Sequence, residues 1–437
     1  MKILLVGINY APDLVGVPKY NTELCEALVD AGHEVRVITA PPYYPAWKVP
    51  EEHRALQIRR RSLNGVRVRR VPIYVPSRPG GVNRLLHHLS FALASAIPLF
   101  RQALIWRPDV MFAVAPSLMS SALVAVLARH VGARSWLHVQ DFEVDAAFNL
   151  GLLRAPRLRK TMIAVERKIL LAFDRVSSIS PQMLNRLSTK GVPADRIREL
   201  RNWVDAIGTE SQRNSASFRQ ELGLSEKHFV ALYSGTMSHK QGLELIVEAA
   251  AALEARLPEV QFVLAGEGPY RETLARIAGG RRNVHFLGLQ PNDRFAELLK
   301  TANVHLVPQR AEAADLVLPS KLGGIFASGR PVIAMATPGT GLAGEIEGCG
   351  VLVPPGDSAA LAEAIVDLQQ QPELCRRLGE SGRKRSLERW DRGGIITQLI
   401  GELSNLTKGE AAVAAEAFVQ TPPPVAASYD SLNVRRG

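Results

Sequence analysis

The stretch KILLVGINYAPDLVGVPKYNTELCEALVDAGHEVRVIT, residues 2–39, decides how the first half of the chain folds. It opens with a short apolar run that ends at Gly7, which predicts a strand. The next segment places Leu24, Leu28 and Ala31 at helical spacing, and the closing VRVIT predicts a second strand. A strand, a helix and a strand in this order indicate a parallel sheet with helices on both faces.

The same alternation continues along the chain and predicts two α/β domains. The polar segment TESQRNSASF has no apolar period and separates them near 205–220. We therefore predict two Rossmann-like, doubly wound parallel-sheet domains over residues 1–205 and 206–385, facing a cleft. A helix over 386–406 is expected to pack back on the first domain, and the Ala/Pro-rich residues 407–437 form a disordered tail. The other expected strands are 66–71, 110–113, 134–139 and 176–179 in the first domain, and FVALYSG, VQFVLAG, VHFLG, VHLVP, PVIAM and GVLVP in the second.

The chain of 437 residues carries a formal charge of +11 at pH 7. This excess predicts an anionic partner, such as a phosphate-bearing ligand or an anionic membrane face. Nucleic acid is disfavoured, because the basic residues are not interleaved with aromatic ones in a recognisable module. The cysteines Cys25, Cys349 and Cys375 lie far apart, which predicts a reducing compartment and no structural zinc. We expect no signal peptide and no spanning helix, because no run of about 20 apolar residues is uninterrupted.

In open parallel sheets ligands bind beyond the carboxyl ends of the strands, so we expect the chemistry there. In NYAPDLVGVPKYN, Gly16 precedes a helix and lets the backbone approach a phosphate or sugar, with an ordinary connecting loop as the alternative. In WLHVQDFEVD, His138 and Asp141 follow a strand, and a carboxylate near an imidazole can orient it or hold its proton. The alternative is a structural histidine, but Glu143 and Asp145 crowd the same exit and favour function.

The second domain has a similar exit at LYSGTMSHKQGLELI. Gly235, Thr236 and Lys240 combine small residues, free amides and a cation before a helix, which predicts a pyrophosphate seat. Glu267 in LAGEGPYRE follows the next strand and can accept hydrogen bonds from a sugar or a base, with a plain loop carboxylate as the alternative. No Walker pattern occurs, which argues against a nucleotide hydrolase loop.

The segment AEAADLVLPSKLGG, Ala311–Gly324, places acids and a lysine at the exit of another strand. Glu312 and Asp315 can accept from sugar hydroxyls, and the turn with Ser320 and Lys321 can neutralise a diphosphate. A surface loop with solvated charges is the alternative, but it explains poorly a lysine in these apolar surroundings.

These stretches carry a family resemblance. YSGTMSHKQGLELIVEAA, LAGEGP and DLVLPSKLGGIFASGRPVIA resemble the donor-binding half of glycosyltransferase family 4, which has the two-domain GT-B fold. GINYAPDLVGVPKYNTELCEALVDAGHEVRVITAPPYYP and LHVQDFEVDAAFNLGLL resemble more narrowly the colanic-acid biosynthesis branch of that family. The resemblance runs from Met1 to about Leu406.

The resemblance implies a retaining glycosyltransferase that needs no metal or other cofactor. A GDP- or UDP-linked sugar is held by the second domain, and the branch points to a hexose or a deoxyhexose such as fucose. The acceptor, held by the first domain, is a polyprenyl-diphosphate-linked sugar or an oligosaccharide in cell-surface polysaccharide synthesis. The implied location is cytoplasmic, with peripheral contact at the inner face of the plasma membrane.

Matching positions imply roles for single residues. Gly16 lies near the donor phosphates, and His138 lies at the reacting sugar. Gly235, Lys240 and Lys321 hold the diphosphate.

The chain departs from the family pattern in two places. Many members carry paired glutamates, the second of which grips the ribose, but Gly324 stands where that second glutamate would fall. Glu312 is followed eight residues later by Ser320, so it forms no such pair and Asp315 is the better carboxylate. Thr236 replaces the usual arginine after the loop glycine, and the lysine that follows it is shifted by one position.

The apolar segment within Val82–Arg107 bears on the acceptor. It is flanked by Arg84, Arg101 and Arg107, and Pro98 interrupts it. Such a segment can lie on an anionic membrane near a lipid-linked sugar, with a buried helix pair as the alternative.

Two other functions remain as alternatives. A GT-B sugar-nucleotide epimerase or hydrolase would release nucleotide without an acceptor. A catalytically silent nucleotide-binding scaffold is favoured by the missing glutamate, whereas His138 and Lys321 count against it.

Overall fold

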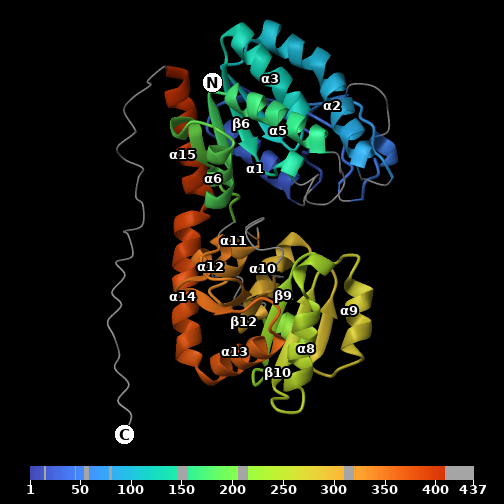
Figure 1. The fold of residues 1–437 in the computed structure, drawn as a ribbon, viewed down its shortest axis with the longest axis vertical. Coiled ribbons are helices and arrows are strands. Elements are labelled where there is room, and N and C mark those ends of the chain that lie inside the picture. Colours follow the sequence, from blue (N-terminus) through green and yellow to red (C-terminus); the bar gives the residue numbers. More distant parts are fainter. Residues whose placement is uncertain are drawn as a thin grey trace.

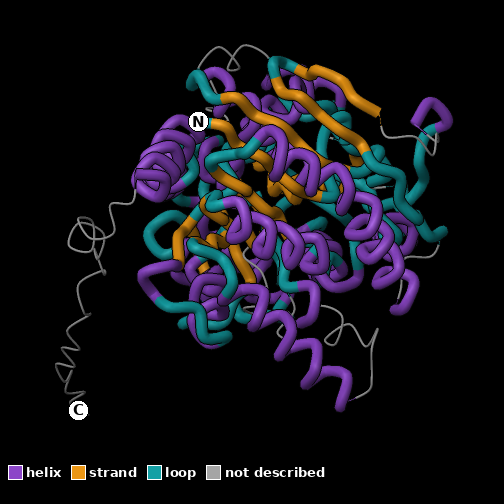
Figure 2. Tube along the Cα trace, turned by 90° about the horizontal axis from the view of Figure 1, so that it is seen from above, coloured by secondary structure: helices purple, strands orange, loops and turns teal. Residues whose placement is uncertain are grey.

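The computed structural model describes residues 1–13, 16–44, 46–53, 59–77, 81–145, 156–204, 215–309, 319 and 321–408. It consists of two α/β domains placed one above the other, with α14 (Pro372–Arg389) beside the second domain and α15 (Arg392–Lys408) beside the first (Figure 1). The strands run through the interior and the helices lie outside them (Figure 2).

The first domain is built on an eight-stranded sheet of order β3-β4-β2-β1-β5-β6-β7-β8. All neighbours are parallel except β3, which pairs antiparallel with β4. The central strands are apolar and buried on both faces, as parallel strands covered by helices must be. The strands are β1 (Lys2–Gly7), β2 (Glu34–Thr39), β3 (Arg59–Leu63), β4 (Val66–Arg70), β5 (Val110–Ala115), β6 (Arg134–Val139), β7 (Arg175–Ser178) and β8 (Ile197–Glu199).

Helices cover both faces of this sheet. On one face α2, α3 and α5 bury Phe91, Leu99, Val124 and Leu170 against it. On the other face α1 packs together with α15 from the far end of the chain. The helices are α1 (Val17–Asp30), α2 (Gly81–Arg101), α3 (Leu118–Val131), α5 (Pro156–Leu171) and α6 (Pro181–Thr189), with a π-helical turn η2 (Gln102–Trp106) and short turns η1 (Glu51–His53) and η3 (Ala194–Arg196).

The second domain contains a six-stranded parallel sheet of order β11-β10-β9-β12-β13-β14. Its strands occupy all six predicted segments, because each is an apolar run bounded by turn residues. They are β9 (Phe229–Ser234), β10 (Val260–Ala265), β11 (Val284–Leu287), β12 (Val304–Val307), β13 (Val332–Met335) and β14 (Gly350–Val353). The helices are α7 (Ser215–Glu221), α8 (Glu244–Leu253), α9 (Arg271–Ala278), α10 (Asn292–Thr301), α11 (Leu322–Ala327), α12 (Gly341–Ile346), α13 (Ser358–Gln370) and α14, with a 3-10 turn η5 (His239–Gln241).

The helix expected over 386–406 is divided at Trp390 between the end of α14 and α15. α15 buries Leu399 and Leu403 against the first domain, although it follows the second. The chain crosses where Val204 pairs with Asp391 in a parallel bridge. The predicted domain boundary near 205 and the predicted tail beyond Lys408 lie outside the described residues.

The carboxyl ends of the two sheets face each other. Gln182, in the first turn after β7, lies so close to Gly341 at the start of α12 that a Cβ atom there would meet its side-chain amide nitrogen at 1.7 Å. Arg201, just beyond β8, forms an ion pair of 3.1 Å with Glu345 of α12. Residues at the strand exits of both domains are therefore directed toward the same boundary.

Candidate functional site

In the second domain, Lys321 lies against the loop that follows β9. Its Nζ is 3.9 Å from the centre of the Tyr233 ring and 3.8 Å from the point that a Cβ atom on Gly235 would occupy. The carbonyl of Thr236 accepts a hydrogen bond of 2.8 Å from the Tyr233 hydroxyl, which fixes the loop. The structure thus brings together three residues predicted for the donor site, Gly235, Thr236 and Lys321. With Tyr233 they form what we call the lysine seat.

The ammonium group of Lys321 is buried, and it has no hydrogen-bond partner in the part of the chain that the structure describes. Burial lowers its pKa from 10.5 to about 7. A buried amine without a partner is costly, whereas a diphosphate placed against it supplies both acceptor oxygens and negative charge. Strongly shifted groups of this kind gather at functional sites, so the seat suits an anionic ligand.

Two glycines of the loop after β10 allow that loop to pack closely against the loop of the lysine seat. Gly266 has φ 143°, and a Cβ atom on it would lie 2.0 Å from the carbonyl oxygen of Gly235. A Cβ atom on Gly268 would lie 2.2 Å from the carbonyl oxygen of Met237. Side chains cannot be accommodated at either place, so this G-x-G serves close packing of two backbones. The amide of Met237 also donates to the carbonyl of Glu267 at 2.9 Å.

The structure does not bring the other residues predicted for the donor site into the lysine seat. The side chain of Glu267 is 57% exposed and forms an ion pair of 3.7 Å with the first residue of α9. The backbone of Lys240 lies in η5, but its side chain is outside the described part. Asp315 and Ser320, with Glu312, also lie outside the described residues. Their roles stay predictions.

In the first domain, Gly16 precedes α1 with φ 76°, and no described residue beyond its chain neighbours lies within 4 Å of the place of its missing side chain. The loop before it is held by residues that sequence reasoning missed. Asp13 accepts hydrogen bonds of 3.2 Å from the amides of Tyr43 and Tyr44, and Arg70 donates to backbone carbonyls of this loop and of the segment after β2. The alternation of buried residues along β4 could have indicated that Arg70 is buried, because it follows Val66 and Val68 on the same face of the strand. The open space at Gly16 leaves room for a ligand group.

His138 lies inside β6, on the sheet face covered by α1 and α15, and it is 4% exposed. The side-chain amide of Gln140 donates to its Nε2 at 3.0 Å, and its Nδ1 therefore donates to the Ser177 hydroxyl at 2.9 Å. Gln140 also exchanges two hydrogen bonds of 2.8 and 2.9 Å with Asn202. Burial lowers the pKa of His138 to about 3, so the ring is neutral. Both ring nitrogens are engaged within the domain, and the visible role of His138 is to position Gln140 at the strand exit. Its predicted place at the reacting sugar stays a prediction.

Three acids follow β6, and two of them are engaged in contacts within the first domain. Glu143 accepts hydrogen bonds from the amides of Ser117 and Leu118, the latter at 3.1 Å, and so caps α3. Asp145 forms an ion pair of 3.1 Å with Lys190. The acid that remains for chemistry at this exit is Asp141, whose pKa is raised by desolvation and lowered by Arg84 of α2. No cluster of metal-ligating side chains is present among the residues described here.

A cluster at the domain boundary was not predicted. Glu345 is 4% exposed and receives Arg201 at 3.1 Å and Arg389 at 2.8 Å. The Arg201 guanidinium also lies 4.9 Å from the centre of the Trp390 ring. These groups come from three distant parts of the sequence, so no local pattern could have joined them. They connect the two domains beside the boundary described above.

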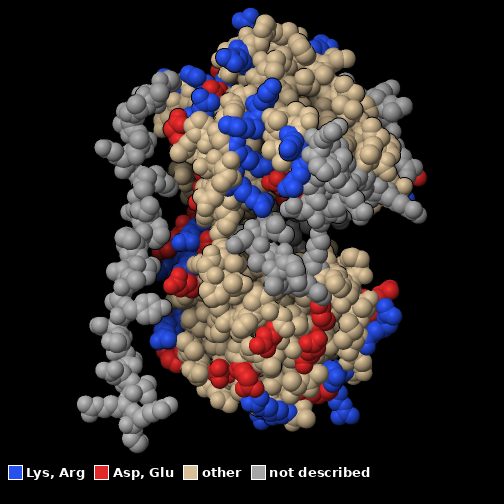
Figure 3. Space-filling view, in the orientation of Figure 1, with Lys and Arg blue, Asp and Glu red and all other residues tan. Residues whose placement is uncertain are grey.

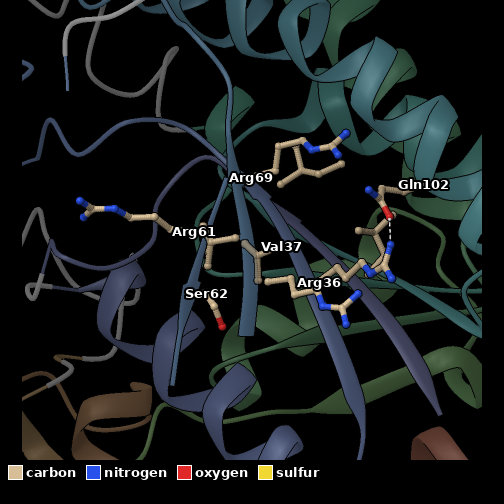
Figure 4. Close-up of a pocket in the computed structure, with 10 residues that line it drawn as sticks. Arg36, Val37, Arg61, Ser62, Arg69 and Gln102 are labelled. Atoms are coloured by element: carbon tan, nitrogen blue, oxygen red, sulfur yellow. Dashed lines mark hydrogen bonds between the residues drawn. The ribbon is translucent and has the colours of Figure 1, made fainter. Parts of the chain in front are cut away.

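A cavity of about 410 Å³ lies on the outer part of the first sheet (Figure 4). Arg36 donates to Gln102 and to Glu34, each at 2.9 Å, and its guanidinium lies 4.1 Å from the centre of the Trp106 ring. Figure 4 shows Arg69 on the same side as Gln102, whereas Arg61 points away. We call this cavity the arginine groove, since its lining includes Arg36, Arg61, Arg67 and Arg69.

Comparisons with known proteins identify the family of the chain. The family model of glycosyl transferases group 1 matches residues 214–385, and the model of the glycosyl transferase 4-like domain matches residues 15–203. The glycosyl transferase WcaI of Escherichia coli (strain K12), which bears a provisional assignment to colanic acid biosynthesis, is 38% identical over 413 residues. That match covers 92% of this chain and 100% of the relative. A GDP-mannose-dependent alpha-(1-6)-phosphatidylinositol monomannoside mannosyltransferase of Mycolicibacterium smegmatis is 26% identical over 91% of this chain and 98% of its own.

Solved structures share the two-domain fold. Sucrose-phosphate synthase from Thermosynechococcus elongatus superposes with a TM-score of 0.70 at 22% identity, covering 93% of this chain and 99% of the other. The Anabaena protein HepE in complex with UDP-glucose superposes with a TM-score of 0.65 at 17% identity, covering 93% and 100%.

Proposed function

The chain belongs to the group 1 glycosyl transferases and is a glycosyltransferase of the GT-B fold, and on that premise we propose a specific reaction. It transfers a hexose or deoxyhexose, such as fucose, from a GDP- or UDP-linked donor with retention of anomeric configuration. The acceptor is a polyprenyl-diphosphate-linked sugar or an oligosaccharide in cell-surface polysaccharide synthesis. The observation that carries the proposal is the ammonium of Lys321, which is buried beside the loop of Gly235 and has no hydrogen-bond partner among the described residues.

The lysine seat is suited to the leaving group of this reaction. As the bond between the sugar C1 and the diphosphate oxygen breaks, negative charge grows on the nucleotide diphosphate. A cation fixed in a low-dielectric site stabilises that charge without reorganisation, and preorganised donors of this kind contribute factors of about 10²–10³ in rate. Lys321 is already in place against the Tyr233 ring, so the site needs no rearrangement of this side chain to receive the phosphates.

The first domain then supplies the acceptor side. The new bond forms between C1 and the oxygen of an acceptor hydroxyl, and the hydroxyl proton passes to the departing diphosphate oxygen. Asp141, exposed at the exit of β6, is available to bind acceptor hydroxyls, and Gln140 beside it is held in position through His138 and Asn202. Gly16 lets the backbone of the first domain approach the donor phosphates from the opposite side.

We propose that transfer needs no metal ion, because Lys321 and the amides of the loop supply positive charge at the diphosphate. Full turnover in excess EDTA is the expected result. A cytoplasmic location accords with the three free cysteines, Cys25, Cys349 and Cys375. Recognition of the ribose falls to Asp315 or Glu267, since Gly324 carries no side chain at the position of the family's second glutamate.

A thermal-shift panel tests the donor site. The full chain is heated with GDP, UDP, ADP and NAD and with the parent sugar nucleotides, beside the variant Lys321→Ala. A ligand present at about 100 times its dissociation constant stabilises the fold by about 2.7 kcal/mol, which is a visible shift. We expect GDP or UDP alone to shift the wild type and neither to shift the variant. Absence of a shift with every nucleotide would contradict the proposal and favour a silent scaffold. Release of free nucleotide at an equal rate with and without acceptor would instead favour an epimerase or hydrolase.

A further inference from the structure

The outer face of α2 is apolar and has no protein partner in the described structure. Val82, Leu86, Leu89, Leu93, Ile97 and Phe100 of α2 and Leu104 of the adjoining η2 recur at intervals of three and four residues, and each is 40–71% exposed. A surface helix of a soluble domain normally carries polar residues along this line. The stripe runs for about 33 Å along the helix axis at 1.5 Å per residue. We call these seven residues the α2 stripe.

The opposite face of the same helix is already committed to the first domain. Phe91 and Leu99 of α2, with Ala103 and Trp106 of η2, are 0–8% exposed and pack in the core of the sheet. The span Val82–Trp106 is long and apolar enough to cross a membrane by length and composition alone. Crossing would expose that core, however, so the structure favours a helix that lies on a surface.

The neighbouring elements extend the apolar surface and border it with basic residues. α3 packs beside α2 and exposes Met119 at 37% and Val126 at 68%. α5 packs beside α3 and exposes Arg159, Lys160, Arg167 and Lys168. Figure 3 shows Lys and Arg side chains gathered over the region where Figure 1 labels α5 and α6.

Basic residues also border the other side of α2. Gln102 of η2 lines the arginine groove and accepts from Arg36 within it. The order across this face of the domain is therefore arginine groove, α2, α3, α5, with apolar residues in the middle and basic ones on both sides.

Acids are nearly absent from the helices of this face, whereas the arginine groove holds Glu34, which is 41% exposed and pairs with Arg36 and Arg67. The helices α2, α3 and α5 contain one, Glu166, which is 2% exposed and paired with Lys190. An apolar centre with cationic borders matches an anionic bilayer, where apolar side chains enter the acyl boundary and each Lys or Arg near the headgroups contributes about 1 kcal/mol. A protein partner of ordinary composition would not require basic residues on both sides.

We propose that the α2 stripe docks this protein on an anionic bilayer, with α5 and the arginine groove against the headgroups. The proposal deepens the proposed function. The role of docking in reaching a lipid-linked acceptor rests on that function. Arg84, in the first turn of α2, lies near enough to Asp141 to influence it electrostatically. The stripe therefore begins beside the acceptor side of the site, so that a lipid-linked sugar reaches Asp141 without leaving the membrane.

Vesicle sedimentation of the full chain tests the docking surface. The vesicles are phosphatidylcholine with about one third phosphatidylglycerol, at low salt. The variant Leu93→Asp/Ile97→Asp changes two positions that are 67% and 71% exposed, and its control Leu289→Asp changes one in the second domain that is 70% exposed. We expect the double variant to lose at least tenfold in the partition coefficient and the control to stay within twofold of wild type.

A second variant keeps the test independent of the apolar substitutions. Lys160→Glu/Lys168→Glu should weaken binding to anionic vesicles at least fivefold and leave the weak binding to pure phosphatidylcholine unchanged. Its control is Lys384→Glu on α14, at a lysine that is 80% exposed. Unchanged sedimentation of both double variants would overturn the proposal, as would a wild-type dimer that Leu93→Asp/Ile97→Asp dissociates, because the stripe would then join two copies.

Turnover on a water-soluble acceptor separates this inference from the proposed function. None of these variants touches the lysine seat or the exit of β6, so each should keep wild-type turnover in solution. Normal turnover with no vesicle binding by the wild type would refute the docking surface alone. Stripe-dependent vesicle binding without turnover on any acceptor would refute the proposed reaction alone.

Discussion

The substitution Lys321→Met should make the protein more stable and much less active. Methionine keeps an unbranched side chain against Tyr233 but removes the buried ammonium, which has no partner among the described residues. The wild type carries the cost of that charge in the absence of ligand, and the variant does not.

The magnitude follows from the lowered pKa. Burial moves the Lys321 pKa from 10.5 to about 7, and each pKa unit corresponds to about 1.36 kcal/mol. The ceiling on the gain is therefore about 5 kcal/mol, and water penetration and relaxation reduce it, so we expect about 1–4 kcal/mol at pH 7. Since the folded pKa lies below the unfolded one, the unfolded state binds more protons between about pH 7 and 10.5. The cost is present in full below that window and disappears as the pH rises through it.

The assay is urea unfolding of the free protein at several pH values, with turnover measured on the same samples. The variant should exceed the wild type in unfolding free energy at pH 7, and the difference should shrink toward pH 10. Its turnover should fall by about 10²–10³. The control Lys384→Met, at an 80% exposed lysine, should change neither quantity. A Lys321→Met protein that is less stable than wild type at pH 7, or that retains turnover within threefold, would refute the reasoning.

Three further predictions concern the same site. Nucleotide affinity should be highest below about pH 7 and fall as the pH rises above it, because binding must then protonate Lys321; calorimetry in buffers of different ionisation enthalpy should show proton uptake at pH 8, and its absence there would count against the seat. His138→Ala should lower kcat at least tenfold while changing the donor Kd less than threefold, because it frees Gln140; equal losses in both would place His138 at the donor instead. Gly266→Ala should lower the unfolding free energy by about 2 kcal/mol or more and weaken nucleotide binding, because its Cβ atom would meet Gly235 at 2.0 Å. The control Gly344→Ala, where no atom lies within 4 Å, should change nucleotide binding little in the same calorimetric titration.

Much of the fold could be predicted because the signal is local. Each strand of the second sheet is an apolar run next to turn residues, so the apolar runs and the turn residues between them were enough to locate all six. β3 was not predicted because its sequence RRRSL has no apolar pattern. It is a strand because it pairs with β4. The short β8 was missed for a similar reason, since IRE gains its place only beside β7.

The site was harder to predict, because it depends on register and on distant contacts. His138 was expected to act beyond the strand, although the expected strand 134–139 already included it; in β6 the ring is buried and Gln140 reaches the exit. An offset of two positions along the chain, from His138 to Gln140, therefore decides whether a side chain stays in the interior or reaches the boundary. Lys321 was found from sequence because a lysine in an apolar stretch is unusual, whereas its position over Tyr233 could come only from the fold.

The central claim is tested most directly by following a labelled sugar from GDP- and UDP-linked donors to a polyprenyl-diphosphate-linked acceptor in anionic vesicles. The account predicts that one donor transfers its sugar with retention of anomeric configuration, that one nucleotide diphosphate is released per sugar transferred, and that release without acceptor is negligible. Nucleotide release at the same rate without acceptor, or no transfer from any donor, would contradict it.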